Sequence, residues 1–213
     1  VNMDTLITMW LAMAFLLLFA FVSTRKLSII PTKIQAVCEA IMGFLWGLLD
    51  SNMGEDEGRK HVPLVASLFL FILTANLMGQ IPLKLFHLSH GELASPTNDI
   101  NMNGAMAIIV LLYYVAMGIK KKKFKFFLRG FGFTDIIEFL IELLDMVTRP
   151  LTPTLRLFGN IMAGEFLVGA ILGLCAYALP LPFMFFEVLV ALIQAFVFTM
   201  LSIVYISSAV EEK

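Results

Sequence analysis

Long blocks of apolar residues constrain the fold of this chain more than any other feature of its sequence. They cover 6–22, 62–81, 100–119 and 183–208. Each block is close to the roughly 20 apolar residues that a helix needs to cross a bilayer. Apolar residues make up 60% of the chain, which lies outside the range of soluble domains. The sequence therefore predicts an all-α integral membrane protein with a single membrane domain over 1–213.

Two further segments do not fit a simple span. The segment 133–175 has no clear breaker except Pro150, Pro153 and a few glycines. As one helix it would measure roughly 60 Å, twice the hydrocarbon thickness of about 30 Å, so it either breaks or tilts steeply. The stretch 31–49 is amphipathic, shorter and more polar than a span, which predicts an interfacial helix. A charged loop over 54–61 is expected to follow it.

The distribution of lysine and arginine predicts the orientation in the membrane. Basic residues gather in 23–61 and in 118–130, whereas the connection 82–99 contains only Lys84. Basic loops face the cytoplasm, so we expect the N-terminus outside and the C-terminus in the cytoplasm. The lysine run over 120–125 then flanks the membrane. A net charge of −1 without a basic face argues against a nucleic-acid partner.

Ionisable residues inside the apolar segments need a reason, because each costs at least a few kcal/mol in lipid. In the long segment they recur at the spacing of one helix face: Asp135, Glu138, Glu142, Asp145, Arg149 and Arg156. The acidic members fit a partly hydrated face at the cytoplasmic entry. Arg156 differs from them, because arginine cannot lose its proton and remains a fixed positive charge.

The remaining polar residues of the last third lie at helical spacings from one another. Glu165 is nine residues after Arg156 and points to the opposite side of a helix. Glu187 and Gln194 are seven apart on one face, which Tyr205 continues. Two interpretations remain open: buried ion pairs that fix helix packing, or an ion path in which the carboxyl groups relay the ion and the arginine is a barrier.

Four segments together carry a resemblance to a known family. They are 154–165 (TLRLFGNIMAGE), 193–205 (IQAFVFTMLSIVY), 95–101 (SPTNDIN) and 75–82 (ANLMGQIP). In these segments the chain resembles subunit a of F-type ATP synthases, and the similarity covers nearly the whole chain in order. The resemblance implies three roughly perpendicular spans, the interfacial helix, and two long tilted helices that form a hairpin against a rotating c-ring.

The resemblance also implies roles for individual residues. Arg156 matches the essential arginine that faces the c-ring carboxylates, and Glu165 matches an acidic half-channel residue. Glu187 occupies a position where some members have histidine. The full set for ion translocation is Arg156, Glu165, Glu187, Gln194 and Asn160, with Asn76, Asn101, Asp99 and Tyr205 as weaker candidates for the outer half-channel. Pro153 departs from the family pattern, and a bend there would change the height of Arg156.

The implied protein is the non-catalytic stator subunit that passes protons or sodium ions to and from the c-ring in a bacterial plasma membrane. Its expected partners are the c-ring, the b-subunit peripheral stalk, the other ATP synthase subunits and membrane lipid. No cofactor is expected, and no phosphate-binding glycine loop is present, so ATP chemistry belongs to other chains. The sequence leaves the choice between proton and sodium open.

Other classes of function are weighed against this interpretation. A secondary transporter or another ion channel would also bury charges, but a transporter should show internal repeats and broken helices in both halves. His87, His90 and Glu92 form a weak candidate metal site in the outer loop. Cys38 and Cys175 are interpreted as small buried apolar residues, with a disulfide or a metal pair as the alternative.

Overall fold

The computed structural model describes residues 3–25, 30–80, 96–122, 133–174 and 180–210. Every regular element in these ranges is helical: α1 (Met3–Thr24), α2 (Lys33–Met53), α3 (Glu55–Gln80), the 3₁₀ helix η2 (Pro96–Asn98), α4 (Ile100–Lys122), α5 (Phe133–Leu174) and α6 (Pro180–Val210). Six helices in the described ranges are long and apolar enough to cross a membrane. The prediction of an all-α membrane protein is confirmed at this level.

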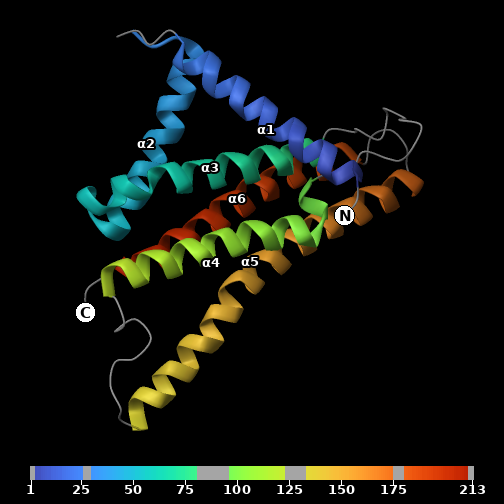
Figure 1. Ribbon diagram of the computed structural model, residues 1–213. Coiled ribbons are helices and arrows are strands. Elements are labelled where there is room, and N and C mark those ends of the chain that lie inside the picture. Colours follow the sequence, from blue (N-terminus) through green and yellow to red (C-terminus); the bar gives the residue numbers. More distant parts are fainter. Residues whose placement is uncertain (1–2, 26–29, 81–95, 123–132, 175–179, 211–213) are drawn as a thin grey trace.

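Helices α3, α4 and α6 lie side by side and form the centre of the molecule (Figure 1). The core between them is apolar and tightly packed, with Val65 and Ile72 of α3 and Ile203 of α6 fully buried. Val110 of α4 belongs to the same core. Burial of such side chains contributes about 1.5–3 kcal/mol each relative to exposure to water, although lipid on the outer faces reduces this gain.

The amphipathic stretch forms α2, which runs across the central bundle and not along it (Figure 1). It starts after Thr32, whose side chain accepts a hydrogen bond from the backbone N–H of Gln35, and it ends before Gly54. With 21 residues, α2 is longer than predicted, and its length and hydropathy also suit a membrane span. The expectation of a segment too short and too polar to cross is therefore wrong, while its interfacial location stays a prediction.

The predicted charged loop over 54–61 is also wrong, because α3 already begins at Glu55. Three acidic residues occupy its first turn, where they stabilise the positive end of the helix dipole. Glu55 pairs with Arg59 and Glu57 pairs with Lys60, at the spacings that bring side chains together on a helix. Only Gly54 acts as the break, with φ of 78°.

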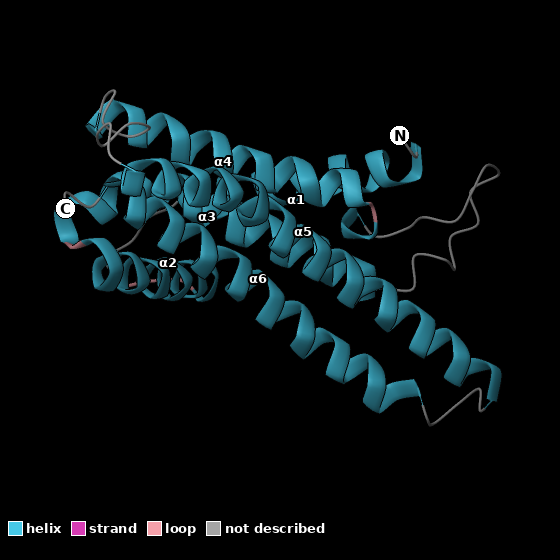
Figure 2. Ribbon diagram, turned by 90° about the horizontal axis from the view of Figure 1, so that it is seen from below, coloured by secondary structure: helices cyan, strands magenta, loops and turns pink. Residues whose placement is uncertain are grey.

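The long segment 133–174 is one helix of 42 residues with Pro150 and Pro153 inside it. Figure 1 shows that α5 changes direction in its middle part, as proline commonly causes. The predicted break is not present, while the steep tilt in the membrane stays a prediction. Helix α6 starts at Pro180, and it runs beside α5 as a long antiparallel pair that extends out of the bundle (Figure 2).

Candidate functional site

Arg156 lies on the outer side of α5, with its side chain exposed. Its neighbour Leu155 is also exposed (49%), whereas Leu157 is only 1% exposed and packs into the core. This alternation shows which side of α5 faces the molecule. Arg156 makes no hydrogen bond or ion pair with any residue that the structure describes. A fixed positive charge is therefore exposed on α5 without a partner among the described residues.

Large apolar side chains are exposed along the α5–α6 pair, among them Leu151, which is 52% exposed and five residues before Arg156. Met162 and Phe166 of α5 are exposed, the latter by 69%. Phe185 and Phe186, at the adjacent start of α6, are exposed by 74% and 61%. A charge within such a surface is costly in lipid unless a counter-charge or water meets it. The geometry therefore suits a partner that brings acidic groups to the membrane interior.

Glu187 of α6 lies directly against α5 at Gly164. A Cβ atom added at Gly164 would overlap Oε1 of Glu187, and it would lie 2.8 Å from Cδ and 3.1 Å from Cγ. Any larger residue at Gly164 would force this carboxyl group to shift. The side chain of Glu187 is half-buried between the two long helices. Gly164, which it contacts, directly precedes Glu165 in the sequence. The side chain of Glu165 itself lies outside the described part.

Gln194 and Asn160, the other two members of the predicted set, are both half-buried. Gln194 is two turns after Glu187 on α6, and Asn160 is one turn after Arg156 on α5. No hydrogen bond among the described residues joins either of them to Arg156. The structure thus places the predicted residues on the same helix pair, and it brings Glu187 against the opposite helix at Gly164.

The predicted outer residues Asp99 and Asn101 meet at the start of α4. The carboxylate of Asp99 accepts hydrogen bonds from the backbone N–H and from Nδ2 of Asn101, both 2.9 Å long. Thr5 of α1 donates a third hydrogen bond to the same carboxylate, at 3.4 Å. Asp99 thus caps α4 and joins it to α1.

Asn103, which the sequence analysis did not single out, lies one turn further along α4 and is fully buried. Its Nδ2 donates to the carbonyl of Thr97 at 2.7 Å. The hydroxyl of Thr154 in α5 donates to the backbone carbonyl of Asn103 at 3.4 Å. This links the start of α4 to α5 two residues before Arg156. The only sequence signal is an asparagine two positions after Asn101, on an otherwise apolar helix face.

Asn76, the third predicted outer residue, lies elsewhere and is 2% exposed. Its Nδ2 donates to the carbonyl of Ala191 in α6 at 3.3 Å, so it joins α3 to the middle of the final helix. Tyr205 is not with the outer group either. It lies near the C-terminal end of α6 beside Arg149, whose guanidinium is 5.1 Å from its ring centre.

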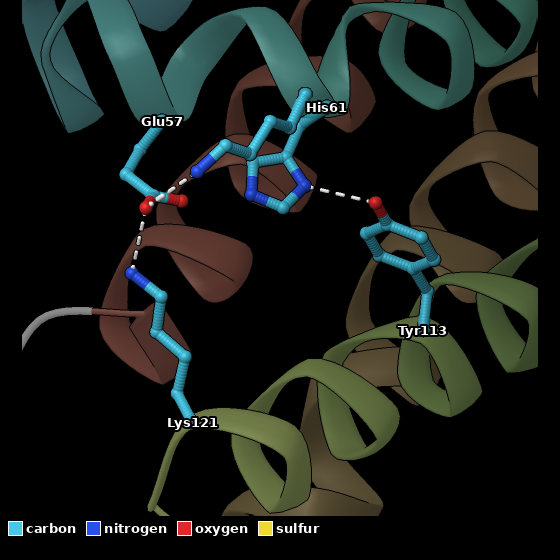
Figure 3. Close-up of polar contacts among 5 residues, drawn as sticks. Glu57, His61, Tyr113 and Lys121 are labelled. Atoms are coloured by element: carbon cyan, nitrogen blue, oxygen red, sulfur yellow. Dashed lines mark hydrogen bonds and ion pairs between the residues drawn. The ribbon is translucent and has the colours of Figure 1, made fainter.

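A second polar cluster lies at the start of α3 (Figure 3). The carboxylate of Glu57 accepts bonds from Lys60 Nζ at 2.8 Å and from Lys121 Nζ of α4 at 3.0 Å. One turn further, Nδ1 of the fully buried His61 lies 2.9 Å from the hydroxyl of Tyr113. Both contacts join α3 to α4, so the cluster holds two spans together at one end.

The structure also bears on the alternative metal and cysteine predictions. Within the described ranges, no group of three or more histidine, cysteine, aspartate or glutamate residues is placed to hold a metal ion. His87, His90 and Glu92 lie outside the described residues, as does Cys175. Cys38 is a free thiol that donates to Ser23 at 3.2 Å.

Comparison with known proteins adds the decisive observation. The sequence model of the family described as ATP synthase A chain matches residues 6–207. The ATP synthase subunit a of Gloeobacter violaceus is 40% identical over 212 residues, which cover 100% of this chain and 85% of that relative. The chain belongs to the ATP synthase A chain family. The resemblance seen in the four sequence segments is therefore confirmed.

Membership of the ATP synthase A chain family settles the general class of function. This family forms the non-catalytic membrane subunit of ATP synthase, so ion transport, and not ATP chemistry, is the task of the chain. The six apolar helices of the described ranges agree with a multi-pass membrane protein.

Proposed function

We propose that this chain is the ion-translocating stator subunit of a rotary ATP synthase, with two offset half-channels that serve the carboxylates of a c-ring. The observation that carries this proposal is Arg156, an exposed and permanent charge within an apolar helix surface. Such a charge is stable at membrane depth only beside acidic groups of another subunit or water. A ring of carboxylates that passes this face supplies the acidic groups.

The coupling follows from the electrostatics at Arg156. A ring carboxylate must be neutral to travel through lipid, because a bare charge there is expensive. Beside the arginine the charged carboxylate is favoured, so the ring site releases its ion at this point. The fixed charge also repels a free cation, which prevents a direct leak between the half-channels. Each charge that falls through 100 mV releases about 2.3 kcal/mol, so several ions are required per ATP.

The other polar residues are assigned to the two half-channels. Asp99, Asn101 and Asn76 provide polarity on the outer side. Glu187, against Gly164, is proposed as a relay carboxyl group between α5 and α6, and Glu165, Gln194 and Asn160 complete the path on the same helix pair. Tyr205 is not retained in the outer group, because its described contacts lie beside Arg149.

Replacement Glu165→Gln is expected to slow ion conduction, which an unchanged transport rate and pH profile would contradict.

The location and partners complete the proposal. The basic segments 23–61 and 118–130 face the cytoplasm, so the N-terminus is outside and the C-terminus is inside. The two long helices α5 and α6 lie against the c-ring, and the b-subunit peripheral stalk holds the chain in place. The membrane is a bacterial plasma membrane.

The test uses the assembled ATP synthase in inverted membrane vesicles. Replacement Arg156→Ala should abolish ATP-driven ion pumping and synthesis driven by an ion gradient, while ATP hydrolysis by the catalytic head persists. Arg59→Ala is the matched control, because it removes an exposed arginine whose partner Glu55 is also exposed. Ion-driven ATP synthesis that persists in the Arg156→Ala enzyme would show that the proposed role is wrong.

The coupling ion requires a separate experiment, because protons and sodium ions both fit this chain. Sodium selectivity depends mainly on ligands of the ring subunit. Transport is measured with the sodium concentration varied at fixed pH. A rate that follows sodium identifies a sodium enzyme, and a rate that is independent of sodium identifies a proton enzyme.

A further inference from the structure

A second arginine of α5, Arg149, lies in the seam where α4, α5 and α6 meet. Its guanidinium carbon is 4.5 Å from the ring centre of Tyr114 and 5.1 Å from that of Tyr205. Asp145, one turn earlier on α5, lies 3.5 Å from Nη2. The arginine side chain is 18% exposed, and Tyr114 is 3% exposed. Aromatic faces attract a cation at such distances, so the charge is held firmly inside the seam.

One donor of this guanidinium points to a specific ligand. Nη1 is buried and has no hydrogen-bond partner among the described residues. Arg149 also lines a cavity of about 10 Å³, whose other polar lining residues are Tyr114, Ser202 and Tyr205 and whose remaining lining is apolar. A cavity of this size accommodates about one water molecule. A buried charged donor beside such a space favours an ordered water over an unmade hydrogen bond.

We propose that Arg149 and one bound water form a second charge barrier, which keeps the seam between α4, α5 and α6 closed to ions. The inference rests on the function proposed above. Hydroxyl groups of tyrosine and serine around a water offer a proton relay between spans. The fixed charge of Arg149 makes a cation at that water unfavourable. Ions are thereby confined to the outer face of α5, where Arg156 lies two turns further along.

Neutral variants separate this barrier from simple packing. The measurement uses membrane vesicles that contain the assembled enzyme and from which the catalytic head is then removed. Arg149→Met keeps a long side chain and removes the charge. Passive proton permeability should rise by about tenfold or more, since a unit charge a few ångströms away strongly disfavours a second cation in the protein interior. Arg149→Lys retains the charge and should remain tight. Tyr114→Phe retains the aromatic face and should also remain tight.

The result that overturns the inference is an assembled Arg149→Met enzyme with the permeability of the unmodified enzyme. If that variant does not assemble, Arg149→Gln is measured in its place, because it is neutral but still donates hydrogen bonds. An Arg149→Lys enzyme that leaks as much as the neutral variants would likewise reject the role of charge.

Vesicles prepared in parallel that keep the catalytic head distinguish this failure from a failure of the proposed function. Arg156→Ala is measured in parallel for coupled pumping. Pumping that persists in Arg156→Ala contradicts the proposed function itself. Loss of pumping in Arg156→Ala, together with a tight Arg149→Met membrane, contradicts only the second barrier.

Discussion

The region around Arg149 and the region around Arg156 lie two turns apart on α5, and they surround the same type of side chain in opposite ways. Arg149 is 18% exposed and is enclosed by Tyr114, Tyr205 and Asp145. Arg156 is exposed among apolar side chains, without an ion pair to any described residue. Between them, Pro150 and Pro153 interrupt the hydrogen-bond pattern of the helix.

This difference distinguishes charges that are stabilised by side chains of the same protein from charges that lack such a partner among the described residues. The chain itself provides the aromatic rings and the carboxylate that stabilise Arg149, so that region needs no other subunit. Arg156 obtains nothing comparable from the described residues, so under the proposed function water or another subunit stabilises it. Replacement of residues such as Arg149 should change the stability of the protein or its passive proton permeability. Replacement of residues such as Arg156 should change coupled transport.

The largest effect is expected from Arg156→Lys. Lysine is a compact charge without the planar fork of arginine, and it can lose its proton at membrane depth. Coupled pumping should therefore fall by about tenfold or more, since proton loss removes the fixed charge. The measurement is ATP-driven pumping in vesicles. Full activity of Arg156→Lys would show that any cationic side chain suffices, and the distinction between the two arginines would then be much weaker.

The next effect concerns the contact between α5 and α6. Gly164→Ala forces Glu187 or the helix to move, because the new methyl group would overlap the carboxyl group. Misplacement of a reacting group by about 1 Å can cost up to about a hundredfold in rate, so a drop of about tenfold in pumping rate is expected from the displaced carboxyl group. Pumping at fixed amounts of assembled enzyme is the measurement.

Gly169→Ala is the matched control, because it lies on the same helix and a methyl group there meets nothing within 4 Å. Both changes raise helix propensity equally, so a difference between them reports the contact alone. The double variant Gly164→Ala with Glu187→Asp should recover part of the rate, because aspartate is one methylene shorter. Equal rates for both alanine variants would mean that Glu187 adapts without loss.

Sequence patterns located the long apolar helices, because lipid imposes one simple requirement on helices that cross it, although the crossing itself stays a prediction. The predicted segment 100–119 corresponds to Ile100–Lys122, and 183–208 corresponds to Pro180–Val210. They failed at 54–61, where a dense group of charges resembles a loop by composition. Local ion pairs and the helix dipole stabilise a helix there. Composition alone does not show this stabilisation, because it depends on the spacing of the charged residues along the helix.

The site was predictable in its residue types but not in its contacts. The spacing that singled out Arg149 and Arg156 together could not show that one is enclosed and the other exposed, because proline changes the direction of α5 between them. The resemblance implies Tyr205 as a weaker candidate for the outer group, whereas the structure places its ring beside Arg149. Asn103 was missed, since a single buried amide leaves no repeating pattern.

A smaller effect, on stability, is expected from Asn103→Ala. The change removes the donor to the carbonyl of Thr97 inside the protein, and a buried group left unsatisfied typically costs about 1–3 kcal/mol. The midpoint of thermal unfolding in detergent should fall, while transport per assembled enzyme should change little. Asn101→Ala is the control for stability, because Asn101 is exposed. A transport defect without a stability defect would move Asn103 from the structural group to the ion path.

The smallest effect is expected at the cluster at the start of α3. Glu57→Gln weakens the bonds from Lys60 and Lys121, but the carboxylate is 28% exposed, so water and salt screen the pairs. The free energy of unfolding should fall by less than about 1 kcal/mol, and less at high salt. Glu55→Gln, which affects only an exposed pair within α3, should have almost no effect. If Glu57→Gln instead slowed pumping with stability unchanged, the cluster would serve transport, and pairing within the chain would no longer distinguish structural charges from functional ones.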